Sequence, residues 1–206
     1  MKMNDELYLV TDESTQVDAL LDIVQEAVKG GVTMVQLREK NSTGKDFYDK
    51  AKKLKTMMDR YDVPLFINDR IDIALAVGAS GVHIGQKDLP LLVVKEMLPS
   101  SMIVGISVST VEQAKEAEKN GADYIGVGAV FPTETKKDAR VLPDGRLSAI
   151  IEAVNIPAFA IGGIKPENIH TLKNQGLAGV SVVSAVMGAE QPERAASELV
   201  EKWTYE

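Results

Sequence analysis

Polar side chains gather at four places along this chain, and each group directly follows a short apolar run. The four groups are residues 36–40 (QLREK), 68–69 (ND), 86–88 (QKD) and 133–137 (TETKK). Cations, carboxylates and hydroxyls that close successive strands would meet in one site assembled from several loops. Two carboxylates among several cations are typical of a divalent metal ion beside a phosphorylated ligand.

The first three groups suggest a metal and anion site. A hard cation such as Mg²⁺ takes one or two carboxylates together with phosphate oxygens of a substrate. Asp69 and Asp88 could supply the carboxylates, and Arg38 and Lys40 could clamp the remaining negative charge. Each carboxylate also has a structural interpretation, because Asp69 could cap the helix that starts near Arg70 and Asp88 could close a turn.

A second anion site is expected later in the chain. Gly162-Gly163 and Ser184 follow two apolar runs, and in a parallel barrel these loops often bind a phosphate through backbone N–H groups. Thr133 and Thr135 add hydroxyl donors in the same sector. The two glycines could instead form only a tight turn. Two separate anion sites would accommodate two substrates or one bisphosphate.

The stretch of residues 132–145 is longer than most loops between a strand and a helix, and it carries Lys136, Lys137 and Arg140. It could close over the site as a lid. The lysine pair could equally be solvated loop charge.

Strand and helix patterns alternate along the whole chain. Glycine and a small residue commonly separate each helical stripe from the next apolar run, and runs without alternating polarity predict strands covered on both faces. We expect a capping box at Thr15 and Asp18, and a helix over residues 166–173. The predicted strands are 7–10, 33–37, 64–67, 81–84, 103–108, 124–130, 158–161 and 179–183.

Eight such units predict a single-domain (β/α)8 TIM barrel over residues 1–206, an α/β fold whose active site lies at the carboxyl ends of the strands. An open doubly wound sheet is the alternative, but the chain contains neither a G-x-G-x-x-G motif nor a P-loop.

Composition excludes several functions. The net charge of −7 argues against nucleic-acid and anionic-membrane partners, and the absence of cysteine excludes thiolate chemistry and disulfides. No apolar run is long enough for a membrane span, and the charged first residues do not resemble a signal peptide. We therefore expect a cytoplasmic protein. A homo-oligomer is compatible with the sequence, which carries no signal for the oligomeric state.

These motifs together resemble the thiamine phosphate synthase family over nearly the whole chain. The most specific segments are residues 35–40 (VQLREK), 81–86 (GVHIGQ) with Asp88, 132–137 (PTETKK) and 161–164 (IGGI). The resemblance implies a transferase that joins hydroxymethylpyrimidine diphosphate to hydroxyethylthiazole phosphate. The products would be thiamine phosphate and pyrophosphate, and the cofactor would be one Mg²⁺ per active site.

The resemblance also implies roles for individual residues. Asp69 and Asp88 would hold Mg²⁺ against the diphosphate, and Arg38, Lys40, Ser107 and Lys136 would act in catalysis. The pyrimidine diphosphate would be bound by Gln36, Arg38, Lys40, Asn68, Ser107 and Lys136. The thiazole phosphate would be bound by Thr133, Thr135, Gly163, Val183 and Ser184.

The family chemistry is dissociative, with departure of pyrophosphate before the thiazole nitrogen attacks, so it requires no protein nucleophile. A convincing Ser–His pair is not evident, and His83 and His170 are expected to be structural or exposed.

Ser109 stands where many relatives carry histidine, which weakens the alternative of a thiazole phosphate tautomerase. A non-catalytic thiazole-phosphate-binding regulator and a phosphosugar isomerase are further alternatives. Neither accounts for Asp69 and Asp88 together with the basic residues.

Overall fold

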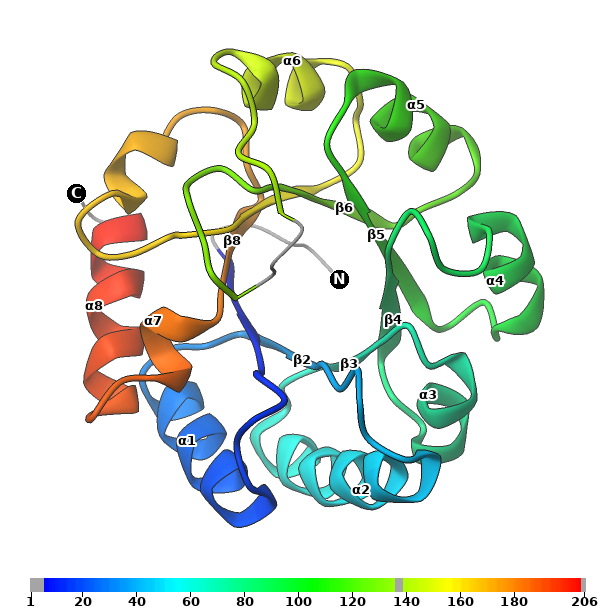
Figure 1. The fold of residues 1–206 in the computed structure, drawn as a ribbon, viewed down its shortest axis with the longest axis vertical. Helices are drawn as coiled ribbons and strands as arrows, with labels where there is room; N and C mark the ends of the chain where they lie inside the picture. The colour runs from blue at the N-terminus through cyan, green and yellow to red at the C-terminus, as the bar shows by residue number, and fades with distance from the viewer. Residues whose placement is uncertain (1–5, 136–138, 205–206) are drawn as a thin grey trace.

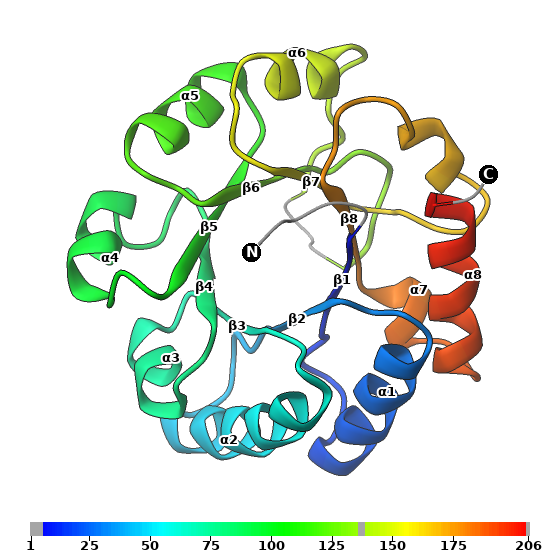
Figure 2. The same cartoon turned by 180° about the vertical axis from the view of Figure 1, so that it is seen from behind.

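A computed structural model describes residues 6–135 and 139–204, and its centre is a closed barrel of parallel strands (Figures 1 and 2). Each strand pairs with the next one in the chain, and β8 pairs with β1 to complete the closure. This confirms the predicted (β/α)8 barrel. The strands are β1 (Glu6–Val10), β2 (Met34–Leu37), β3 (Leu65–Asn68), β4 (Gly81–Ile84), β5 (Ile103–Val108), β6 (Tyr124–Gly128), β7 (Ala158–Ile161) and β8 (Gly179–Val182).

Helices form a ring outside the strands, and α8 lies against α1 where the chain completes the circle (Figure 1). None of the helices in the described part of the chain has both the length and the apolar character that crossing a membrane requires. The helices are α1 (Val17–Lys29), α2 (Gly44–Tyr61), α3 (Ile71–Val77), α4 (Leu91–Met97), α5 (Val111–Lys119), α6 (Arg146–Glu152), α7 (Ser184–Met187) and α8 (Pro192–Thr204), with a 3-10 helix η1 (Ile169–Leu172) after β7.

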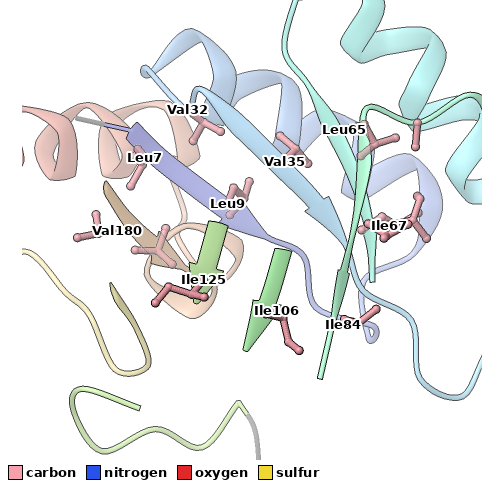
Figure 3. Packing of buried hydrophobic residues seen from close by; sticks show 14 of the residues in the cluster. Leu7, Leu9, Val32, Val35, Leu65, Ile67, Ile84, Ile106, Ile125 and Val180 are labelled. Atoms are coloured by element: carbon pink, nitrogen blue, oxygen red, sulfur yellow. The ribbon is translucent and has the colours of Figure 1, made fainter. Parts of the chain in front are cut away.

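Alternate residues of each strand pack on opposite sides of the barrel wall. In β1, Leu7 and Leu9 join a large apolar cluster shared with the helices, part of which is shown in Figure 3. Tyr8, between them, belongs to a separate cluster. That second cluster consists of Tyr8, Met34, Phe66, Tyr124, Phe159 and Ala178. Its aromatic rings meet edge to face with centroids 5.4 to 6.1 Å apart, so they fill the barrel and form a solid floor beneath the strand ends.

Two strand glycines make room for this aromatic floor. A Cβ atom on Gly105 would lie 2.0 Å from Cζ of Tyr124, and one on Gly81 would lie 2.8 Å from Cε1 of Phe66. Such distances are far below van der Waals contact, so any side chain at either position would displace an aromatic ring.

The expected capping box at the start of α1 is wrong. The helix begins at Val17 without a side-chain cap from Gln16. The carboxylate of Asp12 instead accepts hydrogen bonds from the backbone N–H groups and hydroxyls of Ser14 and Thr15, at 2.8 to 3.0 Å. Thr15 is therefore used to close a turn and cannot cap the helix.

The helix expected over residues 166–173 is also wrong, since only the short 3-10 helix η1 forms there. The side chain of Asn168 accepts from the Lys165 N–H at 2.8 Å and donates to the Gly163 carbonyl at 2.9 Å. Side-chain bonds of this kind compete with the helical backbone pattern. The predicted sixth strand is similarly shorter than expected and ends at Gly128.

The loop after β2 is anchored by a buried ion pair. Nζ of Lys50, in α2, lies 2.5 Å from Oε1 of Glu39, and the two side chains are 10% and 1% exposed. The hydroxyl of Ser42 donates to the other carboxylate oxygen. Glu39 lies between Arg38 and Lys40. This buried contact therefore fixes the backbone from which those two basic side chains extend.

We expect Lys50→Met to destabilise the fold by about 3–5 kcal/mol, because it leaves the Glu39 carboxylate buried without its cation. Urea denaturation of the purified protein measures the difference. Lys55→Met is a matched control on the same helix, since the partner of Lys55, Asp59, is 60% exposed. The control should change stability by about 1 kcal/mol or less. Equal effects of the two substitutions would show that the Glu39–Lys50 pair is not a buried anchor.

Candidate active site

A cavity of about 520 Å³ opens at the carboxyl ends of the strands. The barrel geometry brings together there side chains that lie far apart in the sequence. Lys136 lies outside the described residues. The other predicted site residues all line this one cavity: Gln36, Arg38, Lys40, Asn68, Asp69, Asp88, Ser107, Thr133, Thr135, Gly163, Val183 and Ser184.

One side of the cavity is lined by both acidic and basic side chains. Lys40 forms an ion pair with Asp69, whose backbone has the left-handed conformation with φ of 60°. Helix α3 begins at Ile71 with Arg70 preceding it, so the interpretation of Asp69 as the helix cap is wrong. Asp88 does close a turn, because its carboxylate accepts from the Gly85 N–H at 2.7 Å. That carboxylate also faces Asp69.

The surroundings of Asp69 change its ionisation. Burial raises the pKa of Asp69 above its ordinary value, and the neighbouring Asp88 raises it further, while the hydrogen bond and charge of Lys40 act in the opposite direction. Clustered carboxylates of this kind are stabilised by any additional cation. Among the residues that the structure describes, no group of three or more histidine, cysteine or acidic side chains could hold a metal ion. Two protein carboxylates fit a hard cation that takes its other ligands from phosphate oxygens and water.

Asn68 supplies an unusual donor beside this pair. It is 7% exposed, and its Nδ2 has no hydrogen-bond acceptor within the described part of the chain. Unpaired buried donors are rare in native proteins. Because Asn68 lines the cavity, a ligand acceptor such as a phosphate oxygen would satisfy it.

The backbone that carries the two cations is held on both sides. The Arg38 N–H donates to Oγ1 of Thr11 at 3.1 Å, and the Lys40 N–H donates to Oε2 of Glu13 at 2.8 Å. The buried ion pair between Glu39 and Lys50 holds the same segment. The loop is therefore ordered before any ligand arrives, which limits the conformational entropy lost on binding.

The opposite side of the cavity is built from the loops after β6, β7 and β8. Gly162 and Gly163 have positive φ angles of 105° and 66°, and a Cβ on Gly163 would lie 2.3 Å from the Pro132 carbonyl oxygen. The glycines thus allow the loop after β7 to approach the loop after β6. Gly162 and Gly163 both line the cavity, so they do more than turn the chain, and phosphate binding by their backbone stays a prediction. Asn168 fixes this segment by donating to the Gly163 carbonyl.

Sequence reasoning missed the polar floor of the cavity. His83 was expected to be structural and no Ser–His pair was expected, but Nε2 of His83 lies 2.9 Å from Oγ of Ser107. His83 is paired in register with Gly105, two residues before Ser107, so both side chains face the barrel interior. Reading the strands with a period of two would have found this pair. His170 is exposed, as expected.

A closed parallel barrel with a charged, phosphate-compatible cavity at its strand ends defines a (β/α)8 enzyme. The family model described as "Thiamine monophosphate synthase" matches residues 7–186. The chain belongs to this family.

Individual relatives agree with that assignment. A thiamine-phosphate synthase of Methanobrevibacter smithii is 49% identical and is matched over 96% of this chain and 94% of its own length. One of Ruminiclostridium cellulolyticum is 50% identical over 97% and 96%. The solved thiamine phosphate pyrophosphorylase of Pyrococcus furiosus superposes with a TM-score of 0.88 at 42% identity and covers 98% of both chains. A 3-hexulose-6-phosphate synthase, at 17% identity and a TM-score of 0.71, shares the fold alone.

We expect Lys40→Met to move the titration of Asp69 to higher pH, because the ammonium group lowers the pKa of Asp69. Asp88→Asn should move it to lower pH, since that neighbouring charge raises the pKa. Carboxyl-carbon NMR of the metal-free protein measures both shifts. Arg70→Met is the control, because Arg70 pairs with Asp72 and should leave the Asp69 midpoint in place. Shifts with the opposite signs would contradict the arrangement described here.

The raised pKa of Asp69 also affects the stability of the fold. A carboxyl whose folded-state pKa is raised contributes stability below its unfolded pKa, and that contribution is lost as the pH rises through the folded value. Lys40→Met should therefore make the metal-free protein more sensitive to a rise in pH through the Asp69 titration.

Proposed function

We propose that this protein is a thiamine phosphate synthase. It transfers the hydroxymethylpyrimidine group from its diphosphate to the nitrogen of hydroxyethylthiazole phosphate, and it releases pyrophosphate and thiamine phosphate. The single observation that carries this proposal is one cavity whose lining combines two chemically different sectors. One sector pairs carboxylates with cations, and the other is lined by glycines and hydroxyls.

The diphosphate occupies the sector of Arg38, Lys40, Asn68, Asp69 and Asp88. The cations and the unpaired Asn68 amide bind its oxygens, and Lys136 is proposed as a further cation in this sector. Asp69 and Asp88 would hold Mg²⁺, which when bound would supply neutralising charge for pyrophosphate. Burial and the neighbouring Asp88 raise the pKa of Asp69, so a cation at this place would favour its ionised form.

The thiazole phosphate occupies the other sector. Thr133, Thr135 and Ser184 bring hydroxyl groups to the cavity wall, and the Gly162-Gly163 turn allows the backbone to approach closely. Val183 provides an apolar surface at the edge of β8. The two sectors lie on different sides of the same cavity, which suits a reaction that joins one phosphorylated ring to another.

The proposed mechanism is dissociative, and pyrophosphate departs before the thiazole nitrogen attacks. The C–O bond to pyrophosphate breaks with its electron pair on the leaving group, and the nitrogen lone pair then forms the new C–N bond. No protein nucleophile is required. Fixed cations stabilise the developing negative charge, and the cavity keeps the two rings in contact.

Incubation of the purified protein with both phosphorylated precursors tests the proposal directly. We expect thiamine phosphate and pyrophosphate in equal amounts with Mg²⁺, and neither product with excess chelator. Asp69→Asn and Asp88→Asn should each lower turnover by at least about tenfold while circular dichroism shows an intact barrel. Binding of thiazole phosphate without any product would instead favour the tautomerase or the non-catalytic regulator.

We expect Ser184→Ala to raise KM for thiazole phosphate by about tenfold and to leave KM for pyrimidine diphosphate nearly unchanged, because one hydroxyl donor is lost from one sector. Initial-rate kinetics with each substrate varied in turn measure both constants. Ser109→Ala is a control in the same cavity, because the Ser109 hydroxyl bonds to Gln113 and has no proposed ligand role. Equal increases in both KM values for Ser184→Ala would contradict two separate sectors.

A further inference from the structure

The cavity side proposed for the thiazole phosphate contains little positive charge. Its lining from the loops after β7 and β8 consists of glycines, one serine and apolar side chains, and the loop after β6 adds two threonines. A phosphate monoester carries a charge of about −1.5 to −2 near neutral pH. Helix α7 begins in this sector but spans only Ser184–Met187, so few aligned peptide dipoles contribute to its electrostatic field. A phosphate bound here therefore needs a cationic side chain.

Arg140 meets this requirement. Among the described residues of the loops after β6, β7 and β8, it is the only charged side chain that lines the cavity. It is exposed, and no ion pair joins it to another residue in the described part of the chain. The other basic side chains of the lining follow β2 and β4, which stand opposite β6 and β8 in the closed strand order: Arg38, Lys40 and Lys87.

Backbone contacts place Arg140 beside the glycine turn. The Ala129 N–H donates to the Arg140 carbonyl at 3.4 Å, and the Leu142 N–H donates to the Ala129 carbonyl at 2.8 Å. A Cβ on Gly162 would lie 2.6 Å from Cβ of Ala129, so Ala129 also packs closely against the turn after β7. Figure 1 shows this loop on the side of the barrel where β6 and β8 lie. Arg140 therefore belongs to the same sector as Gly162 and Gly163.

We propose that Arg140 is a specificity-determining residue, which binds the phosphate of the thiazole substrate and thereby selects the phosphorylated thiazole over free hydroxyethylthiazole. The inference rests on the proposed function, in which this sector takes the thiazole phosphate. Arg140 adds a charged group to a set of residues that is otherwise uncharged, namely Thr133, Thr135, Gly163, Val183 and Ser184.

The geometry of arginine suits this role. A guanidinium group is a planar fork that can donate two hydrogen bonds to two oxygens of one phosphate. The hydroxyls and backbone N–H groups of the sector remain for the other oxygens. Free hydroxyethylthiazole has no negative charge and cannot form the paired contact. Hydrogen bonds between charged groups change affinity by about tenfold to a hundredfold, and Arg140 should give at least the lower value.

Calorimetric titration of the intact protein and of Arg140→Met measures the effect without turnover. The probes are hydroxyethylthiazole phosphate, free hydroxyethylthiazole and pyrophosphate with Mg²⁺. We expect Arg140→Met to raise Kd for the thiazole phosphate at least about tenfold, and to change the other two Kd values by less than about twofold. Arg140→Lys should recover part of the affinity, because lysine keeps the charge but not the fork.

Arg146→Met is the matched control. Arg146 begins α6 in the same connection between β6 and β7, but it does not line the cavity, so its replacement should leave all three Kd values unchanged. An unchanged Kd for the thiazole phosphate in Arg140→Met would overturn the proposal, and so would an equal loss in Arg146→Met. A loss confined to pyrophosphate would assign Arg140 to the opposite sector and would also overturn it.

Failure of the proposed function gives a different result. An intact protein that binds the thiazole phosphate but forms no thiamine phosphate would count against the synthase, whereas the Kd values of Arg140→Met would still decide the role of Arg140. Normal product formation together with an unchanged Kd in Arg140→Met would reject the role of Arg140 and leave the proposed function intact.

Discussion

The structure depends on the closure of eight parallel strands through the pairing of β1 with β8. A parallel sheet that closes has no free edge, and all of its carboxyl ends lie on one rim. Closure also gives every strand an inner and an outer face. The outer faces pack on helices, whereas the inner faces fill the barrel with aromatic rings below and polar groups above. The site is thus a geometric consequence of the barrel.

The rim is held in place by buried polar contacts. The Glu39–Lys50 pair anchors the segment that carries Arg38 and Lys40, and Asn168 fixes the turn at Gly163 on the opposite side. Glu39, Lys50 and Asn168 lie outside the predicted ligand set, yet their contacts determine where the predicted ligand-binding groups are placed. A reaction that depends on positioning and on fixed charge requires this kind of support, since reorganisation at the moment of reaction would raise its barrier.

The floor and the rim have complementary tasks in the proposed reaction. Charged groups at the rim interact with the diphosphate and its cation, where negative charge develops. The floor contains hydrogen-bonding side chains, among which His83 lies between the hydroxyls of Tyr124 and Ser107. In the proposed reaction, the electrostatics of the leaving group depend on Arg38, Lys40, Asp69 and Asp88 at the rim.

Local patterns in the sequence determined the strand order, the barrel and most of the cavity wall, because apolar periodicity and the residues that follow each strand depend on neighbours in the chain. The sequence failed where a residue had several possible partners. Asp69 could cap a helix or pair with Lys40, residues 166–173 could form a helix or an Asn168 turn, and His83 could be a core residue or a partner of Ser107. Only the tertiary structure decided these cases. The Lys40–Asp69 and His83–Ser107 contacts join residues of different strands and loops, so their free energies depend on distances that exist only when the barrel is closed. The bonds of Asn168 are local, but they hold a segment that packs closely against the loop after β6.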